Sequence, residues 1–272
     1  MESSHFTIMI SASIVTYHTP QSELDRCIAC LQQSPLVSSI CVIDNSVNNV
    51  GYGAGHNKAI RQSASKYHLV INSDVTFEPG TLEFLFEYME CHPDVGQCIP
   101  RTLNTDGSVQ HVCRLLPTPF DLLVRRFLPS TWFRKQRQRY TLAFTDYDHE
   151  MNVPYHMGCF MFFRRSALDA IAICPKSSSS GTCAPTSDVQ YFDERFFLYP
   201  EDIDITRRMH RFYRTMFVPD VTIVHQHRQS SYHSFHLMCV HIYNMCKYFN
   251  KWGWLIDDER KSFNQKCLTQ NQ

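Results

Sequence analysis

The amino-acid sequence predicts an α/β fold with a mostly parallel central sheet flanked by helices. Strand and helix patterns alternate through the first hundred residues, which is typical of such sheets. Several predicted strands end in acidic or polar turns, and open α/β sheets bind ligands beyond the carboxyl ends of their strands. With 272 residues, of which 43% are hydrophobic, the chain can form one large domain or two small ones.

The predicted elements of the first half follow the spacing of apolar residues. Alternation predicts a strand over 6–16, and Leu24, Ile28 and Leu31 share one face of the helix that follows. Thr19 and Pro20 suit the start of that helix, which ends near Ser34. The later elements are a strand over 40–43, a helix over 56–65 opened by a glycine-rich turn, a strand over 68–71 and a helix that starts at Pro79.

The second half is predicted to be less regular. An apolar strand spans 153–163 and crosses Gly158. A serine-rich segment over 176–187 is typical of a flexible insertion. The remaining predicted elements are a helix over 200–213, a strand over 215–225 and an amphipathic helix over roughly 233–252.

The charge balance disfavours nucleic-acid binding as the main function. Lys plus Arg and Asp plus Glu number 26 each, so no global field draws the chain onto DNA or RNA. No apolar window approaches the ~18 uninterrupted residues of a membrane span, and residues 1–6 do not resemble a signal peptide. Twelve cysteines without an export signal suggest reduced thiols in a cytosol. The single pair Cys27 and Cys30 is more typical of a helix than of a zinc site.

The basic segment over 125–139 and the final amphipathic helix each allow two interpretations. Residues from Arg125 to Arg139 include six basic side chains and no acidic one. They form either a solvated face or a surface for phosphate or anionic lipid. The final amphipathic helix either packs on the core or meets a membrane. Peripheral membrane contact is therefore one expectation for this chain.

Acidic residues and a histidine stand where the predicted strands end. Asp44 closes the second strand, Asp74 follows a later one, and His225 ends the last. A carboxylate and an imidazole can hold Mg²⁺ or Mn²⁺, whose remaining positions are left for the oxygens of a diphosphate. A carboxylate standing apart from the metal, at the helix start near Asp202, is then free to act as a base.

Each of these residues also has a purely structural interpretation. Acidic side chains such as Glu201 and Asp202 stabilise a first helical turn without any function. Asp44 can start an Asx turn, and a single histidine after a strand is often structural. The glycine-rich segment 51–55 lacks the Lys-Ser/Thr ending of a P-loop and does not follow the first strand. That position disfavours both an NTPase and an NAD-dependent oxidoreductase.

Taken in order, the motifs resemble those of the inverting nucleotide-sugar glycosyltransferases of family 2, in particular the bacterial rhamnosyltransferase-like branch that builds surface polysaccharides. The matching segments are Ile14–His18, Val42–Ser46, Asn49–Asn57, Asn72–Val75, Met157–Met161, Phe192–Tyr199, Glu201–Asp204 with Arg208, and Val224–His225. The resemblance covers most of the chain and implies a GT-A fold. The GT-A domain would span 1–232, with a nucleotide-sugar half over about 1–105 and an acceptor half over about 106–232. A C-terminal helical extension would follow over 233–272.

The resemblance also implies roles for individual residues. The donor nucleotide would contact Thr16, Tyr17, Asp44, Asn45, Asn57 and Ser73. Asp74 and His225 would hold Mg²⁺ or Mn²⁺, with Asn72 standing where many relatives have Asp. Asp202 matches the general base of the family. The three residues expected to orient the acceptor or to hold the start of the helix are Glu201, Asp204 and Arg208.

The resemblance therefore implies a metal-dependent enzyme that moves a hexosyl or deoxyhexosyl group from a nucleoside-diphosphate sugar to a glycan or lipid-linked acceptor. It would act in the cytoplasm, at the inner face of the cell membrane. The sequence departs from the family at two places, and the first of them, the shortened base-binding region, favours an alternative, a noncatalytic subunit of a polysaccharide-assembly complex. Val47 and Asn48 are nearly all that stands where relatives place a helix and a strand, and the serine-rich insertion precedes Phe192.

Overall fold

The computed structural model describes residues 9–129, 131–174, 189–226 and 235–271. The predicted serine-rich insertion over 176–187 lies outside these residues. The strands are β1 Ile10–Thr16, β2 Val37–Asp44, β3 Tyr67–Ile71, β4 Val75–Phe77, β5 Val95–Leu103, β6 Cys113–Arg114, β7 Met151–Asn152, β8 Tyr155–His156, β9 Phe160–Arg164 and β10 Arg214–His225. The helices are α1 Gln21–Gln32, α2 Tyr52–Gln62, α3 Thr81–Cys91, α4 Pro119–Phe127, α5 Arg134–Tyr140, α6 Arg165–Ala170, α7 Glu201–His210, α9 Phe235–Trp252 and α10 Asp258–Gln270.

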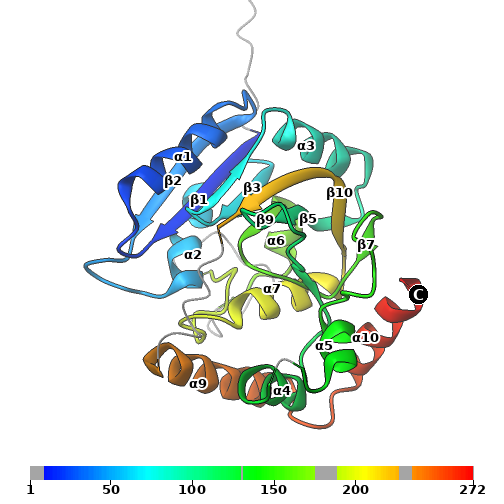
Figure 1. The fold of residues 1–272 in the computed structure, drawn as a ribbon. Coiled ribbons are helices and arrows are strands. Elements are labelled where there is room, and N and C mark those ends of the chain that lie inside the picture. Colours follow the sequence, from blue (N-terminus) through cyan, green and yellow to red (C-terminus); the bar gives the residue numbers. More distant parts are fainter. Residues whose placement is uncertain (1–8, 130, 175–188, 227–234, 272) are drawn as a thin grey trace, which may run out of the picture.

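A central sheet organises the molecule (Figure 1). Its strands follow the order β2-β1-β3-β9-β5-β10-β4, and β7 pairs with β10. The pairings of β1 with β2, β1 with β3 and β5 with β10 are parallel, as predicted. β9 runs antiparallel between β3 and β5 and joins the two parallel sets.

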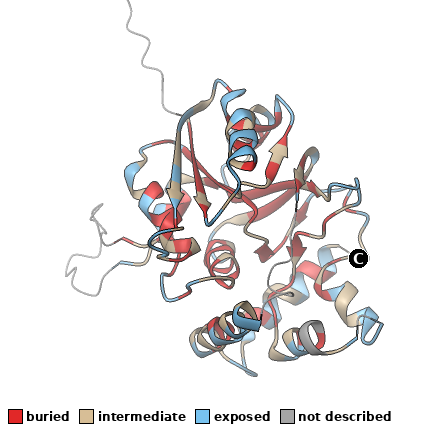
Figure 2. Ribbon diagram, turned by 60° about the vertical axis from the view of Figure 1, so that its left-hand side comes forward, coloured by how far each residue is buried: buried red, intermediate tan, exposed pale blue. Residues whose placement is uncertain are grey.

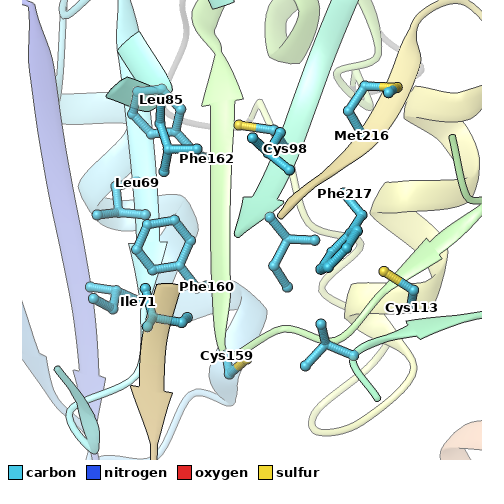
Figure 3. Packing of buried hydrophobic residues seen from close by; sticks show 14 of the residues in the cluster. Leu69, Ile71, Leu85, Cys98, Cys113, Cys159, Phe160, Phe162, Met216 and Phe217 are labelled. Atoms are coloured by element: carbon cyan, nitrogen blue, oxygen red, sulfur yellow. The ribbon is translucent and has the colours of Figure 1, made fainter. Parts of the chain in front are cut away.

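Both faces of the sheet are buried by helices. Leu69 and Ile71 belong to a core cluster with residues of α1 and α3, some of which are drawn in Figure 3. Val70, between them in β3, packs instead with α2, α6 and α7. Because successive side chains of a strand point to opposite faces, this alternation shows that β3 is covered on both sides. The buried strands stand out against the more exposed outer surfaces of the helices in Figure 2.

Glycines allow α2 to lie close to the sheet. The helix begins at Tyr52, four residues earlier than predicted, so Gly53 and Gly55 lie in its first turn. A Cβ atom on Gly55 would stand 2.7 Å from a side-chain carbon of Val15. The glycine-rich segment is thus the first turn of a helix packed against β1.

The apolar segment 153–163 is two strands and not the single one predicted. The chain leaves β8, which pairs with β6 in a separate two-stranded sheet, at His156 and enters the central sheet at Phe160, so Gly158 lies in the turn between them. The strand β5 was not predicted, because Gly96, Gln97 and Pro100 interrupt its apolar pattern. The first six positions of β5 are all buried. Their packing compensates for the weak strand propensity of these residues.

The short connection after β2 lies at the edge of the sheet. Within the described residues β2 pairs with β1 alone. A connection shorter than the resemblance implies would therefore remove residues from an edge and leave the central strands intact. This position explains how the fold accommodates the connection at Val47 and Asn48.

The C-terminal helices pack against α7. Met245 and Phe249 of α9 belong to a buried cluster with Ile203 of α7. Arg207 of α7, only 1% exposed, pairs with Asp257 at 2.6 Å just before α10. The side of α9 that faces α7 thus packs on the core, which was the first of the two interpretations of this helix.

Ten of the cysteines are free thiols. Cys27 and Cys30 both lie on α1, in agreement with their helical interpretation. Cys174 is disulfide-bonded, so the expectation of reduced thiols is wrong at that position.

Candidate active site

Asp202 lies in the first turn of α7 and is held by three hydrogen bonds. Its Oδ2 accepts from the backbone N–H of Gly158 at 3.1 Å and from the Tyr155 hydroxyl at 3.2 Å. Its Oδ1 accepts from the N–H of Ile203 at 2.8 Å. The carboxylate is therefore fixed between the start of α7 and the turn that joins β8 to β9.

Burial changes the acidity of both carboxyls at this helix start. It raises the pKa of Asp202 to about 6, even though the hydrogen bonds from Ile203 and Gly158 partly offset it. Burial and the neighbouring Asp202 raise the pKa of Glu201 well above its usual range. Glu201 Oε2 has no hydrogen-bond partner among the described residues. A carboxylate that titrates close to neutral pH is suited to accept a proton in a reaction.

Asp74 and His225 meet where β4 pairs with β10. Asp74 Oδ1 lies 3.3 Å from His225 Nε2, and the register places His225 opposite Val75. Gln110 Oε1 lies 2.7 Å from the other ring nitrogen, Nδ1. Burial alone lowers the pKa of His225, but Cys159 and Asp74 outweigh it and raise that pKa to about 10.

The chemistry of these two side chains fits a divalent cation. A carboxylate oxygen and a nitrogen of a neutral imidazole are donors that Mg²⁺ and Mn²⁺ accept. A cation bound there would therefore replace the proton on His225 Nε2, which faces Asp74. Asp74 Oδ1 is buried without a well-directed hydrogen bond in the described part of the chain. Gln110 could orient the ring of His225 as the outer partners of metal-binding histidines do. Across residues 9–129, 131–174, 189–226 and 235–271, no group of three or more His, Cys, Asp and Glu side chains could hold a metal.

Tyr52 connects the Asp74 turn to the Asp202 turn. Its hydroxyl lies 3.0 Å from Asn72 Oδ1 and 2.7 Å from the carbonyl oxygen of Gly158, and can donate to either. Burial raises the pKa of Tyr52, and the charges of Glu201, Asp202 and Asp74 raise it further. The Tyr52 hydroxyl thus bridges the turn that contains Asp74 and the turn that holds Asp202. The sequence did not indicate this role, since a tyrosine inside a glycine-rich segment carries no signal for it.

Thr16 and Asp44 lie side by side at the ends of β1 and β2. They are partners in the parallel register of the two strands. Asp44 is exposed and accepts the N–H of Ser46 at 2.8 Å, which is the predicted Asx turn. Hydrogen bonds from Ser46 lower the pKa of Asp44. Tyr17, the next residue after β1, is also exposed, so a carboxylate and an aromatic ring face solvent at this end of the sheet.

Three other residues assigned to the nucleotide have partners within the protein. Asn57 is buried and uses its whole amide: Nδ2 donates to Phe192 O and Glu194 Oε1, and Oδ1 accepts from two backbone N–H groups. Asn45 Nδ2 donates to the carbonyl of Gly51 at 3.2 Å, which leaves its Oδ1 without a partner in the described residues. Ser73 donates to Glu23 at 2.8 Å. The structure thus gives Asn57 a role in fixing the loop before α7 and no free atom for a nucleotide.

Asp204 anchors α9 to α7. Its Oδ2 accepts from Arg208 at 2.9 Å, and its Oδ1 accepts from Lys251 at 2.5 Å and from the Trp252 ring N–H at 2.8 Å. Arg208 also donates to the carbonyls of Ile171 and Tyr191. Arg208 thus pairs with an acid of its own helix, and both side chains are occupied in the fold.

Arg114 is a second residue near the site that the sequence analysis did not select. It lies in β6, which pairs with β8 next to Tyr155, and its guanidinium carbon stands 5.9 Å from the centre of that ring. Burial raises the pKa of Asp202, and the charge of Arg114 is among the effects that oppose the rise. Arg114 Nε has no hydrogen-bond partner among the described residues. A cation so placed is available to an anionic group of a ligand.

The fold and the site together define a class of protein. An α/β sheet that gathers carboxylates at its strand ends, with a helix start beside them, is the arrangement expected for a GT-A glycosyltransferase. The family model "Glycosyl transferase family 2" matches residues 26–172, more than half of the chain. The chain therefore belongs to glycosyl transferase family 2.

Sequence relatives support this membership. Two curated proteins, from the strains CDC 1551 / Oshkosh and ATCC 25618 / H37Rv of Mycobacterium tuberculosis, are described as N-acetylglucosaminyl-diphospho-decaprenol L-rhamnosyltransferases. Each is 25% identical to this chain in an alignment 198 residues long, which covers 67% of this chain. The match covers 58% of the length of each relative.

Solved structures support the fold. The crystal structure of S. aureus TarS has a TM-score of 0.51 at 13% identity, covering 86% of this chain and 39% of TarS. The structure of TarS residues 1–349 has a TM-score of 0.49 at 14% identity, covering 86% of this chain and 64% of that one. The likeness to full TarS confirms the predicted α/β architecture.

Proposed function

We propose that this chain is an inverting glycosyltransferase that moves a sugar from a nucleoside-diphosphate sugar to a glycan or lipid-linked acceptor in cell-surface polysaccharide synthesis. The observation that carries the proposal is the position of Asp202. It accepts the N–H of Gly158, and Tyr52 links the carbonyl of Gly158 to Asn72 in the turn that contains Asp74. Burial raises the pKa of this carboxylate to about 6. Family membership and the relatives named as rhamnosyltransferases support transfer of a hexosyl or deoxyhexosyl group.

Asp202 is the proposed general base. It would accept the proton of an acceptor hydroxyl while the hydroxyl oxygen forms a bond to the anomeric carbon of the donor. The bond from that carbon to the diphosphate breaks on the opposite side, and the electron pair leaves with the nucleoside diphosphate. One such displacement inverts the configuration of the sugar. The hydrogen bonds from Gly158 and Tyr155 would keep the carboxylate aimed at the acceptor.

The donor would lie across the strand ends, from Thr16 and Asp44 toward Asp74. Asp74 and His225 would hold Mg²⁺ or Mn²⁺, and a cation bound there would offset the charge that develops on the leaving diphosphate. Tyr52 would keep the two turns of the site in register through Asn72 and Gly158. Arg114 would attract an anionic group on the acceptor side, next to Asp202.

The experiment is nucleotide release from a panel of UDP-, dTDP- and GDP-sugars with Mn²⁺ and candidate acceptors. We expect one donor to be consumed by the wild-type chain and by Asp148→Asn, a control in which an exposed acid is changed. Asp202→Asn should release far less nucleotide from the same donor. An Asp202→Asn variant as active as the wild type would remove Asp202 as the base.

The alternative is a noncatalytic subunit that retains the fold, and the short connection after β2 motivates it. Calorimetry with UDP, dTDP and GDP in the presence of Mn²⁺ separates the two functions. The enzyme must bind at least one of these nucleotides, whereas a chain that binds none of them would be a noncatalytic subunit.

A further inference from the structure

Exposed apolar side chains gather at one end of the molecule. They belong to α4, the segment just before α5, α9 and the loop before α10: Phe120, Leu123, Trp132, Phe133, Ile242, Tyr243, Trp254, Leu255 and Ile256. Figure 1 shows α4, α5 and α9 at the end away from α1 and α3. Leu255 and Ile256 are each 85% exposed. Large apolar groups so exposed and so grouped mark a surface that meets a partner. We refer to this set as the α4–α9 face.

The α4–α9 face is built on helices that are fixed to one another. Phe120 and Phe133 stack edge to face with ring centres 5.5 Å apart. Gln136 of α5 donates to Asp121 of α4 at 2.6 Å. Arg137 donates to the carbonyl of Leu128 at 2.7 Å. The exposed aromatic groups are therefore presented from a rigid pair of helices.

An apolar groove lies between α4 and α9. It has a volume of about 240 Å³ and its lining includes Leu122, Leu123, Ile242, Met245 and Phe249. Met245 and Phe249 are buried in the cluster that also contains Tyr155, a hydrogen-bond partner of Asp202. The same apolar cluster thus reaches from the groove to the candidate active site.

Basic side chains border the α4–α9 face. Arg134, Lys135 and Arg139 of α5 are exposed. Between Arg125 and Arg139 the sequence contains no acidic residue to neutralise them. Apolar and aromatic groups flanked by Lys and Arg are the composition of surfaces that bind anionic lipid bilayers.

We propose that the α4–α9 face docks the protein on an anionic lipid bilayer. Leu255 and Ile256 enter the boundary between headgroups and acyl chains, while Arg134, Lys135 and Arg139 contact the anionic headgroups. The charge of α5 favours an anionic bilayer over an apolar protein surface, because a bilayer offers partners to the basic groups as well as to the apolar side chains. No helix in the described part of the chain is long and apolar enough to cross a membrane, and docking requires none.

The test is co-sedimentation of the full chain with vesicles of phosphatidylcholine alone or with phosphatidylglycerol added. We expect binding to the mixed vesicles and at least tenfold weaker binding to the neutral ones. Arg134→Gln/Lys135→Gln/Arg139→Gln should lower the partition coefficient by about a hundredfold, at roughly fivefold for each charge. Leu255→Ser/Ile256→Ser should lower it at least tenfold.

Matched controls change similar groups elsewhere. Val47→Ser removes an apolar side chain that is 97% exposed on the edge loop, and Arg26→Gln/Lys58→Gln removes two exposed charges of α1 and α2. Both should bind like the wild type, and all variants should keep the wild-type unfolding temperature. The proposal would be overturned if the control variants lost as much vesicle binding as the test variants. It would also be overturned if the wild type bound neutral vesicles as tightly as mixed ones. A dimer without vesicles that Leu255→Ser/Ile256→Ser converts to a monomer would overturn it too, because the face would then join two copies of the chain.

Discussion

The backbone N–H of Gly158 lies 3.1 Å from Asp202 Oδ2, although 44 residues separate the two in the chain. The approach is close enough that a Cβ atom on Gly158 would stand 3.1 Å from Asp202 Cβ. Gly158 thus lets the turn between β8 and β9 lie directly against the first turn of α7. This contact holds the proposed base in the site, and several expectations follow from it.

Substitution of Gly158 by Ala should weaken the hydrogen bond to Asp202. The added methyl group must push the turn and the carboxylate apart by a few tenths of an ångström. Because a hydrogen bond to the charged form lowers the pKa of a carboxyl, its loss should raise the pKa of Asp202. We expect turnover to fall about tenfold and the acidic limb of the pH–rate profile to move to higher pH. An unchanged profile would show that this hydrogen bond does not control the base.

Activity should rise with pH through about 6. Asp202 acts as a base only when ionised, and burial raises its pKa to about 6. The rate should therefore be low at pH 5, half-maximal near the pKa and level above about pH 7. Initial rates measured at saturating donor across this range would check the expectation. A rate that is constant from pH 5 to 8 would contradict it.

Loss of the Asp204 carboxylate should destabilise the C-terminal part of the fold. Asp204→Ala would leave Arg208 and Lys251 without their common buried partner, and breaking a buried pair costs about 3–5 kcal/mol. We expect urea to unfold the variant at a clearly lower concentration and proteases to cleave near α9 sooner. Asp169→Ala, which removes an exposed partner of Arg165, serves as the control and should lose less than about 1 kcal/mol.

Removal of either proposed metal ligand should weaken binding of Mn²⁺. We expect His225→Gln and Asp74→Asn each to lower the affinity for Mn²⁺ in the presence of the nucleoside diphosphate at least tenfold, because each removes one of two protein donors. Calorimetry or the paramagnetic relaxation of water protons would measure this affinity directly. Wild-type affinity in both variants would place the cation elsewhere.

The parts of this architecture that could be predicted are those that depend on local patterns. Alternation and helical spacing located β1, α1 and β3, and the strand-end rule indicated Asp74 and His225, which lie 3.3 Å apart. The start of α7 was predicted from Pro200 and the acids that follow it. These features are encoded by neighbours in the sequence.

The parts that could not be predicted depend on contacts between distant segments. The Tyr52 hydroxyl meets the carbonyl of Gly158 across 106 residues, and no local pattern encodes such a contact. Asn57 resembles a ligand-binding residue in sequence, but in the structure its amide fixes the loop at Phe192. The strand β5 was missed because tertiary packing overrides the weak strand propensity of Gly96 and Pro100.

The role of Asp202 is tested most directly by nucleotide release and thermal unfolding of Asp202→Asn at pH 8. Because folding raises the pKa of this carboxyl above its usual value, ionisation destabilises the fold as the pH rises through about 6. The Asp202→Asn variant should therefore unfold at the same or a higher temperature than the wild type, while its rate of nucleotide release falls about a thousandfold. A variant that is equally stable and retains wild-type activity would contradict the assignment of Asp202 as the base.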